Sequence, residues 1–276
     1  RSVLIPPLLH SKLKPVVIQT RGRSFLEYCL RRCSSGENGE EDGPLVTYEV
    51  DTVQYDGVET SEEIGCFGAG TMGSKQGVND ILNLLDDMEK ISIIGVGVTE
   101  AGLSSPSSPT MIHLAQILHK IYTLSSSSSL KCPNPTGKIC IINTDNVPQN
   151  GSTIYSHMVH IAKHDYADDD DDDRNEKFIE FLENKVVFLN TMVDRITSQR
   201  DGSNGLVPKC EPIPMKCLVI EDIHGDLPRE FYDDDIKNKF GVVIRTKPNQ
   251  LKTDIDLKLR VANGTHTAIS HVMSLS

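Results

Sequence analysis

The sequence predicts an α/β fold in which helices cover both faces of a mainly parallel sheet. Short apolar runs rich in β-branched residues alternate with segments of helical periodicity along most of the chain. Strands that are apolar throughout are buried on both faces, which is typical of a doubly wound parallel sheet. Ligands of such sheets lie beyond the carboxyl ends of the strands. We therefore expect the chemistry in the residues that follow each strand.

The predicted elements follow from this alternation. We expect strands at residues 16–18, 45–53, 91–98, 139–142, 186–189, 217–220 and 242–244. Helical patterns cover residues 25–32, 78–88, 111–122 and 152–164. Two low-complexity segments, serine at 125–129 and aspartate at 168–173, cannot bury apolar surface, so we expect mobile surface loops there.

Composition excludes several classes of protein. The 276 residues carry 28 Lys+Arg and 39 Asp+Glu, a formal net charge of −11, which argues against a nucleic-acid or anionic-membrane partner. No apolar run approaches the ~20 residues that span a bilayer. Residues 1–9 are apolar but interrupted by two prolines, so we expect no secretory signal. The chain begins with Arg1 rather than Met, so we expect some sequence upstream of it.

The cysteines indicate a reducing compartment. Seven are scattered along the chain without any C-x-x-C pair, which does not fit a disulfide framework or a zinc knuckle. We predict free thiols and a cytoplasmic protein.

One glycine motif is expected to be a decoy. Residues 68–73 read G-A-G-T-M-G and match G-x-G-x-x-G, but the preceding residues 59–67 make a poor buried strand. The first predicted strand-to-helix turn, Q-T-R-G-R-S at residues 19–24, is better placed for a nucleotide phosphate. An ordinary turn explains it equally well.

Histidines at 157, 160 and 164 share one helix face and could bind zinc. Their neighbours suit a packed amphipathic helix better, so the zinc site is the weaker hypothesis.

A third group of polar residues near the end of the chain suits chemistry at a carbonyl. On a regular α-helix, Lys258, Asn263 and His266 fall within an arc of roughly 140°. A desolvated lysine can act as acid or base, and an amide can stabilise a developing oxyanion. An ordinary surface helix would also accommodate all three.

Five segments resemble a known family. Residues 258–266 resemble its K-x-x-x-x-N-x-x-H signature, and residues 190–197 resemble its N-[ST]-M-V-D-R-I-T motif. Shorter matches are T-E-A-G at 99–102, D-N-x-x-x-N-G at 145–151 and V-I-E-D at 219–222. The family is that of the polyol-specific long-chain dehydrogenases, the mannitol dehydrogenase family, which includes mannitol 2-dehydrogenase, fructuronate reductase and tagaturonate reductase.

The resemblance implies a Rossmann-like dinucleotide-binding domain over residues 1–212 and the start of a helical C-terminal substrate domain over residues 213–276. It implies metal-independent hydride transfer between NAD, or NADP, and a polyol/ketose or hexuronate. Lys258 would be the general acid/base, Asn190 and Asn263 would stabilise the alkoxide, and His266 would orient the substrate. The cofactor cleft would contain Gly22, Arg23, Phe25, Thr99, Glu100, Asp145 and Asn146.

Three departures from the family pattern stand out. Arg21 and Arg23 replace the glycines of the family's G-x-G-x-F turn, where side chains hinder close approach of a pyrophosphate. Ile255 occupies the position of an acid three residues before the lysine. The chain stops at Ser276, where relatives continue into a long helical domain. We therefore expect either a truncated product or a partner, including a second copy, that covers the apolar face of the last helix. The alternative function is a catalytically inactive relative that serves as a binding or scaffold protein.

Overall fold

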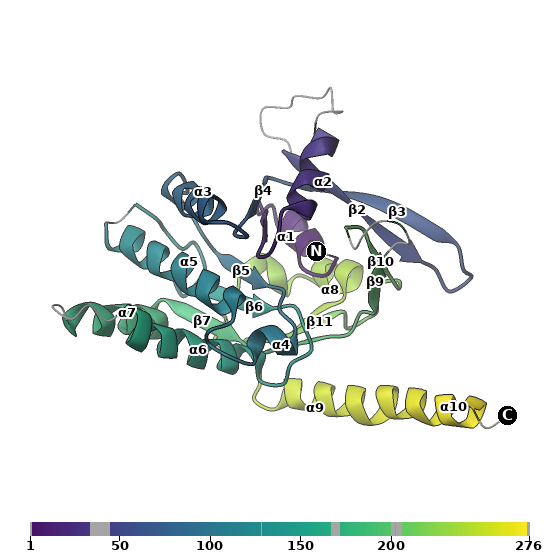
Figure 1. The fold of residues 1–276 in the computed structure, drawn as a ribbon. Helices are drawn as coiled ribbons and strands as arrows, with labels where there is room; N and C mark the ends of the chain where they lie inside the picture. Colours follow the sequence, from purple (N-terminus) through teal and green to yellow (C-terminus); the bar gives the residue numbers. More distant parts are fainter. Residues whose placement is uncertain are drawn as a thin grey trace.

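The structure is a computed structural model and describes residues 2–33, 45–127, 129–166, 172–199, 202 and 206–274 (Figure 1). Residues 34–44 and most of the aspartate run lie outside these residues. The α/β fold class is confirmed.

Three parallel strands form the centre of the molecule. They are β5 (Ile93–Val96), β6 (Ile139–Asn143) and β7 (Val186–Leu189), in the order β5-β6-β7. The β6 strand is buried along its whole length, because Ile139 and Ile141 face one apolar cluster while Cys140 and Ile142 face another. Burial on both faces is what the continuous apolar run predicts.

Helices cover one face of these strands (Figure 1). They are α3 (Lys75–Asp86), α4 (Glu100–Leu103), α5 (Pro109–Ser126), α6 (Asn150–Asp165) and α7 (Asp172–Asn184). The fully buried residues Leu118, Ile121, Ile154 and Leu182 belong to the cluster between the helices and the sheet. This is the largest apolar core of the described chain, so it positions the carboxyl ends of β5 and β6.

The other face packs against a second group of elements. The strand β11 (Leu218–Glu221) pairs in parallel with β12 (Val242–Arg245) and antiparallel with β8 (Thr191–Val193). The short helices α1 (Ile5–His10), η1 (Arg229–Tyr232) and α8 (Asp234–Phe240) pack beside them, through Leu8, Phe231 and Ile236. The strands follow the prediction, but the antiparallel β8 was not expected.

The N-terminal part adds two smaller sheets. The strand β1 (Val16–Gln19) pairs in parallel with β4 (Gly68–Thr71), and α2 (Ser24–Cys33) follows β1. A long antiparallel hairpin of β2 (Val46–Val53) and β3 (Glu59–Cys66) projects from the body and continues into β10 (Pro208–Cys210) and β9 (Thr197–Gln199) (Figure 1).

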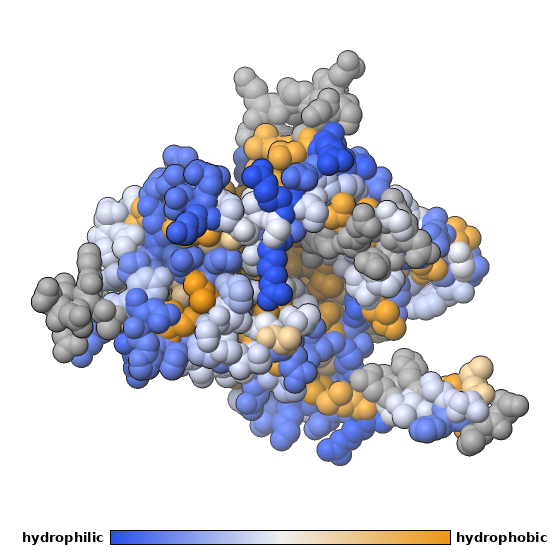
Figure 2. All heavy atoms as spheres, in the orientation of Figure 1, coloured by the Kyte–Doolittle hydropathy of each residue, from blue (hydrophilic) through white to orange (hydrophobic). Residues whose placement is uncertain are grey.

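The C-terminal segment is one long helix that leaves the body (Figure 1). It consists of α9 (Gln250–Leu257), the π-helical segment η2 (Lys258–Asn263) and α10 (Gly264–Ser274). Several large apolar side chains along it are exposed: Leu257, Leu259, Val261, Ile269, Val272 and Met273. Figure 2 shows hydrophobic surface where this helix leaves the body. The π-helical segment contradicts the regular α-helix assumed for Lys258, Asn263 and His266.

Other differences from the prediction have local causes. The helix α1 was not predicted, because Pro6 and Pro7 interrupt the segment; Pro at the first positions of a helix is well tolerated, since the amides there have no helical acceptor. The serine segment is not wholly a loop, because Ser125 and Ser126 complete α5. Likewise, Asp172 and Asp173 of the aspartate run already belong to α7.

Five described cysteines are free thiols, as predicted. They are Cys66, Cys132, Cys140, Cys210 and Cys217, and most of them are buried. Burial raises the pKa of Cys66 to about 12 and that of Cys217 to about 11, so both stay protonated at neutral pH. In the described part of the chain, the helices are too short or too polar to cross a membrane.

Gly151 is required where α6 begins against the end of β7. A Cβ atom at this position would lie 2.6 Å from the carbonyl carbon and oxygen of Leu189 and 2.7 Å from the carbonyl oxygen of Phe188. These are backbone atoms of the central sheet, so they cannot move aside without disturbing it.

We predict that Gly151→Ala lowers the free energy of unfolding by about 1–3 kcal/mol, because the methyl group overpacks a rigid contact. Urea denaturation followed by circular dichroism measures the change. The control is Gly264→Ala, since a Cβ there lies 3.9 Å from its nearest neighbour, the Leu259 carbonyl oxygen, in a helical position. We expect the control to be neutral or slightly stabilising; equal losses in the two variants would contradict the argument.

Candidate functional site

The carboxyl ends of β5 and β6 lie at the same edge of the central sheet, since the strands are parallel and Val96 is paired with Asn143. Thr99 follows β5 and is the N-cap residue of α4, whose first residue is the exposed Glu100. Asp145 and Asn146 follow β6. The two predicted turns are therefore neighbours, where a ligand of a parallel sheet lies.

A buried amide fastens this edge to the next strand. The Asn150 side-chain nitrogen donates to the Thr191 hydroxyl at 2.8 Å and to the carbonyl oxygens of Asp145 and Thr191, both at 3.2 Å. The Asn150 side-chain oxygen accepts from the backbone nitrogens of Gly151 at 2.8 Å and Thr191 at 3.0 Å. The Thr191 hydroxyl in turn donates to the Asn143 carbonyl at 2.7 Å. One side chain thus joins the end of β6, the start of α6 and the start of β8.

Asn146 makes a second link in the same place. Its side-chain oxygen accepts from the Val193 backbone nitrogen at 3.0 Å, and its own backbone nitrogen donates to the Asp145 carboxylate at 2.7 Å. The two motifs at residues 145–151 and 190–197 are therefore one hydrogen-bonded unit. Some residues of these two motifs are therefore explained by the hydrogen bonds that join them rather than by chemistry on a ligand.

Lys258 reaches the same unit from the C-terminal helix. Its ammonium group donates to the Val193 carbonyl oxygen and lies 3.1 Å from the Asp194 carboxylate. The Lys258 side chain is only 14 % exposed, whereas that of Asp194 is 45 % exposed. The amine is thus largely withdrawn from water and is held beside the edge that carries Asn146.

Of the other predicted catalytic residues, Asn190 is the first residue of the motif at 190–197, which also contains Val193 and Asp194. Its side-chain oxygen accepts from the Ser152 backbone nitrogen at 3.2 Å, on the first turn of α6. Asn190 therefore lies just before the first residue of β8, whereas Lys258 contacts Val193, the last residue of β8. Asn263 and His266 lie on η2 and α10, but their side chains are outside the described part of the structure.

The first turn has a different character from a glycine-rich phosphate loop. Gly22 has φ of +66°, and Arg21 and Arg23 are exposed. The Gln19 side-chain oxygen accepts from the backbone nitrogens of Phe25 at 3.1 Å and Leu26 at 3.4 Å. These are the amides at the helix start that would otherwise face an anion.

A neighbouring loop packs directly on this turn. The Thr71 hydroxyl donates to the Gly22 carbonyl at 2.5 Å, and a Cβ at Gly73 would lie 2.6 Å from the Gly22 nitrogen. Gly68 and Gly70 belong to β4 rather than to a strand-to-helix turn. The position of these two glycines inside a strand agrees with the interpretation of residues 68–73 as a decoy.

The histidine cluster has ordinary contacts. A ring nitrogen of His157 lies 2.7 Å from the Leu103 carbonyl oxygen, and the rings of His160 and His164 are 4.4 Å apart. Across the residues with described positions, no three His, Cys, Asp or Glu side chains are grouped so that they could hold a metal ion.

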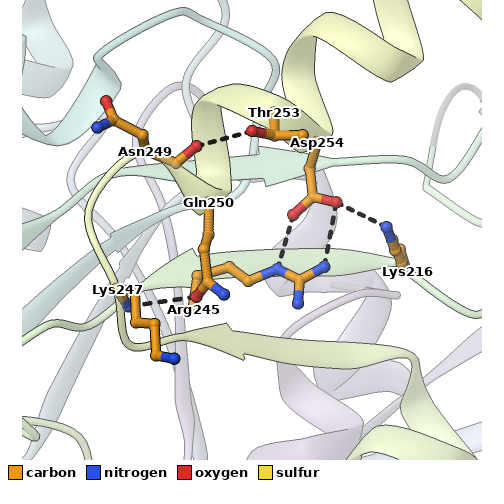
Figure 3. Close-up of polar contacts among 7 residues, drawn as sticks. All are labelled: Lys216, Arg245, Lys247, Asn249, Gln250, Thr253 and Asp254. Atoms are coloured by element: carbon orange, nitrogen blue, oxygen red, sulfur yellow. Dashed lines mark hydrogen bonds and ion pairs between the residues drawn. The ribbon is translucent and has the colours of Figure 1, made fainter.

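The acids on either side of Ile255 are both paired with basic residues. Asp254, 4 % exposed, accepts two bonds from Arg245 at 2.7 and 3.1 Å and one from Lys216 at 2.6 Å (Figure 3). Burial alone would raise the Asp254 pKa, but the hydrogen bonds from the two cations hold it below the ordinary value. Asp256 lies 3.9 Å from Arg260 at the surface. Asp254 was missed by sequence reasoning, because its partners are distant in the chain.

A parallel sheet with buried central strands, polar turns at its carboxyl edge and helices on both faces defines a Rossmann-type domain. Residues 48–228, about two thirds of the chain, match the family model described as the mannitol dehydrogenase Rossmann domain. The chain therefore belongs to the mannitol dehydrogenase family. The matched segment contains the turns after β5 and β6 and the motif at 190–197, but neither the first turn nor Lys258.

Two curated proteins of Saccharomyces cerevisiae, mannitol dehydrogenase DSF1 and mannitol dehydrogenase 2, are each 31 % identical over 139 residues. That alignment covers 48 % of this chain and 25 % of theirs, so the chain matches about a quarter of the length of these relatives.

Solved structures share the fold. A D-sorbitol dehydrogenase in substrate-free form has a TM-score of 0.61 at 17 % identity, covering 94 % of this chain and 52 % of its own. Pseudomonas fluorescens mannitol 2-dehydrogenase, in a ternary complex with NAD and D-mannitol, has a TM-score of 0.52 at 17 % identity, covering 85 % and 53 %.

We predict that Thr191→Val destabilises the protein by about 1–3 kcal/mol, because it removes the shortest hydrogen bond of the buried Asn150 amide and the hydroxyl that donates to the Asn143 carbonyl. Chemical denaturation measures the loss. The matched control is Thr60→Val on the exposed face of β3, where we expect a change within about 0.5 kcal/mol. A Thr191→Val protein as stable as the control would show that the buried link is dispensable.

Proposed function

We propose that the protein is an NAD(P)-dependent oxidoreductase that transfers a hydride between a nicotinamide and a polyol/ketose or hexuronate substrate. The observation that carries this proposal is the location of Lys258. A largely buried amine from the C-terminal helix lies against β8, within the family motif at residues 190–197. Membership of the chain in the mannitol dehydrogenase family supports oxidoreduction with a nicotinamide cofactor as the class of reaction.

In this mechanism Lys258 is the general acid/base on the substrate oxygen. When a carbonyl is reduced, the hydride adds to the carbonyl carbon and Lys258 gives a proton to the oxygen; in oxidation the proton returns to Lys258. The low exposure of the side chain limits exchange of that proton with bulk water. The Lys258 ammonium group forms an ion pair with the Asp194 carboxylate at 3.1 Å. We propose that the side-chain amides of Asn190 and Asn263 stabilise the developing alkoxide. His266 would orient the hydroxyl groups of the substrate.

The edge of the central sheet fits a dinucleotide better than the first turn does. Thr99, Glu100, Asp145 and Asn146 follow neighbouring parallel strands and would line the cofactor. A bound nicotinamide would supply or accept the hydride. At the first turn, in contrast, Gln19 already accepts from the amides of Phe25 and Leu26. We propose that Gly22, Arg23 and Phe25 contact the cofactor only after this side chain moves.

We propose that the boundary between the cofactor-binding domain and the substrate domain lies near residue 212. Residues 1–212 would bind the cofactor, and residues 213–276 would begin the substrate domain and supply Lys258. The helix α9 packs on β8 and β11 through Leu251, which contacts Met192 and Val219. This packing brings the proposed acid/base to the cofactor-binding part.

The second candidate is a non-enzymatic relative that acts as a binding or scaffold protein. The occupied amides of the first turn and its two arginines favour this alternative. Fluorescence titration with NADH and NADPH, followed by a screen of hexitols, ketoses and hexuronates, separates the two. Saturable binding with turnover supports the enzyme; no binding at millimolar cofactor supports the scaffold.

We predict that Lys258→Ala abolishes turnover while leaving the Kd for NADH or NADPH nearly unchanged, because Lys258 acts on the substrate oxygen. Steady-state kinetics and fluorescence titration measure the two quantities. The control is Lys252→Ala, an exposed lysine on the same helix, which we expect to be silent. A Lys258→Ala enzyme that keeps most of its kcat would show that the role is misassigned.

We predict that Arg21→Gly combined with Arg23→Gly tightens cofactor binding, because it removes side chains from the place where a pyrophosphate approaches the backbone. The control replaces both residues by lysine, which keeps bulk and charge. We expect the Kd from fluorescence titration to fall in the glycine variant alone. Weaker binding in the glycine variant would instead make the arginines phosphate ligands.

A further inference from the structure

We propose that Asp254, held by Arg245 and Lys216, is the positioning residue that fixes Lys258 at the sheet edge. The inference rests on the proposed function, in that it assigns a role to Asp254 in the placement of the proposed acid/base. Nothing in the family pattern at residues 258–266 includes this carboxylate.

The first step is the geometry of the ion cluster. Arg245 at the end of β12 donates through Nε to Oδ2 of Asp254 at 2.7 Å and through Nη2 to Oδ1 at 3.1 Å, a two-point contact that fixes orientation as well as distance (Figure 3). Lys216, in the segment before β11, donates to Oδ1 from the other side at 2.6 Å. The carboxylate therefore ties α9 to two neighbouring parts of the body.

The second step links the cluster to Lys258. The two residues are four apart, so they lie on the same helix face, and the Lys258 backbone nitrogen donates to the Asp254 carbonyl oxygen. The Asp254 side chain binds beside β12 while the Lys258 side chain binds Val193 of β8. Turning or sliding α9 would break the first contact and withdraw the amine from the second.

The third step is that the helix has few other anchors. Its apolar contact is made by Leu251, with Ile255 partly buried beside it. Beyond Lys258, the apolar residues Leu259 and Val261 are more than half exposed. The π-helical segment begins at Lys258. Only the residues before Lys258, which include Asp254, therefore connect it to the body through a regular α-helix. Among the described residues, the ion cluster is thus the main polar contact that ties α9 to the body, apart from the contacts of Lys258 itself with Val193 and Asp194.

The test compares Asp254→Asn with Asp256→Asn in the same full chain. Asparagine keeps the size of the side chain but leaves the charges of Arg245 and Lys216 uncompensated. Asp256 is its matched control, since its partner Arg260 lies 3.9 Å away at the surface. The first readout needs no activity: the rate at which acetic anhydride modifies Lys258, determined by mass spectrometry and normalised to the exposed Lys252.

We expect Lys258 acetylation to rise several-fold in Asp254→Asn and to stay unchanged in Asp256→Asn. In the active enzyme, kcat should fall by about tenfold or more in Asp254→Asn, with little change in the KM for the cofactor. Asp254→Glu should restore part of kcat, because it returns the charge. Unchanged Lys258 acetylation in a folded Asp254→Asn protein would overturn the proposal.

Two further outcomes are decisive. If the wild-type chain shows no turnover but Asp254→Asn still exposes Lys258 to acetylation, the positioning role stands and the proposed function fails. If turnover is present and neither readout changes, the positioning role fails and the function stands. Should Asp254→Asn not fold, Lys216→Met removes only the more exposed cation, and we expect a smaller rise in Lys258 acetylation; no rise overturns the proposal.

Discussion

The side chain of Asn150 is the constraint on which the functional edge depends. In the centre of the fold it makes five hydrogen bonds, to Asp145 in the turn after β6, Gly151 in α6 and Thr191 in β8, and no water is needed to satisfy it. A buried amide with every partner in place specifies one arrangement, because any other leaves unpaired polar atoms. The positions of Asp145, Asn146 and Val193, and through Val193 that of Lys258, follow from this arrangement.

The same hydrogen bonds and close contacts explain why particular residue types occur in the family motifs at 145–151 and 190–197. Gly151 is small because the end of β7 lies against it, and Thr191 carries a hydroxyl because Asn143 and Asn150 need a partner between them. Arg195 of the second motif donates to the Ser2 carbonyl at 2.6 Å and so holds the N-terminal segment. Much of the motif therefore builds the edge, and Asn190 is the residue of this motif to which we have assigned a proposed chemical role.

The central sheet could be predicted from sequence, because a fully buried strand such as β6 has no polar residue before Asn143. The hairpin strand β3 could not, since its first residues are exposed and charged and only hydrogen bonding to β2 makes it a strand. The Lys258 region shows a different limit. A spacing rule of about 100° per residue holds for α-helix alone, and η2 departs from it within the motif. The roles of Gln19 and Asp254 depend on partners that only the fold brings close.

The contact between Gly73 and Gly22 has a mechanical consequence. Backbone meets backbone there without intervening side chains, and the Thr71 hydroxyl holds the two loops together. Ser74, the next residue, caps α3 by accepting from the Gly77 nitrogen at 3.1 Å. Anything that pushes the arginine-bearing loop outward must carry the start of α3 with it. A ligand bound at the turn between β1 and α2 would thus also press on the turn that precedes α3.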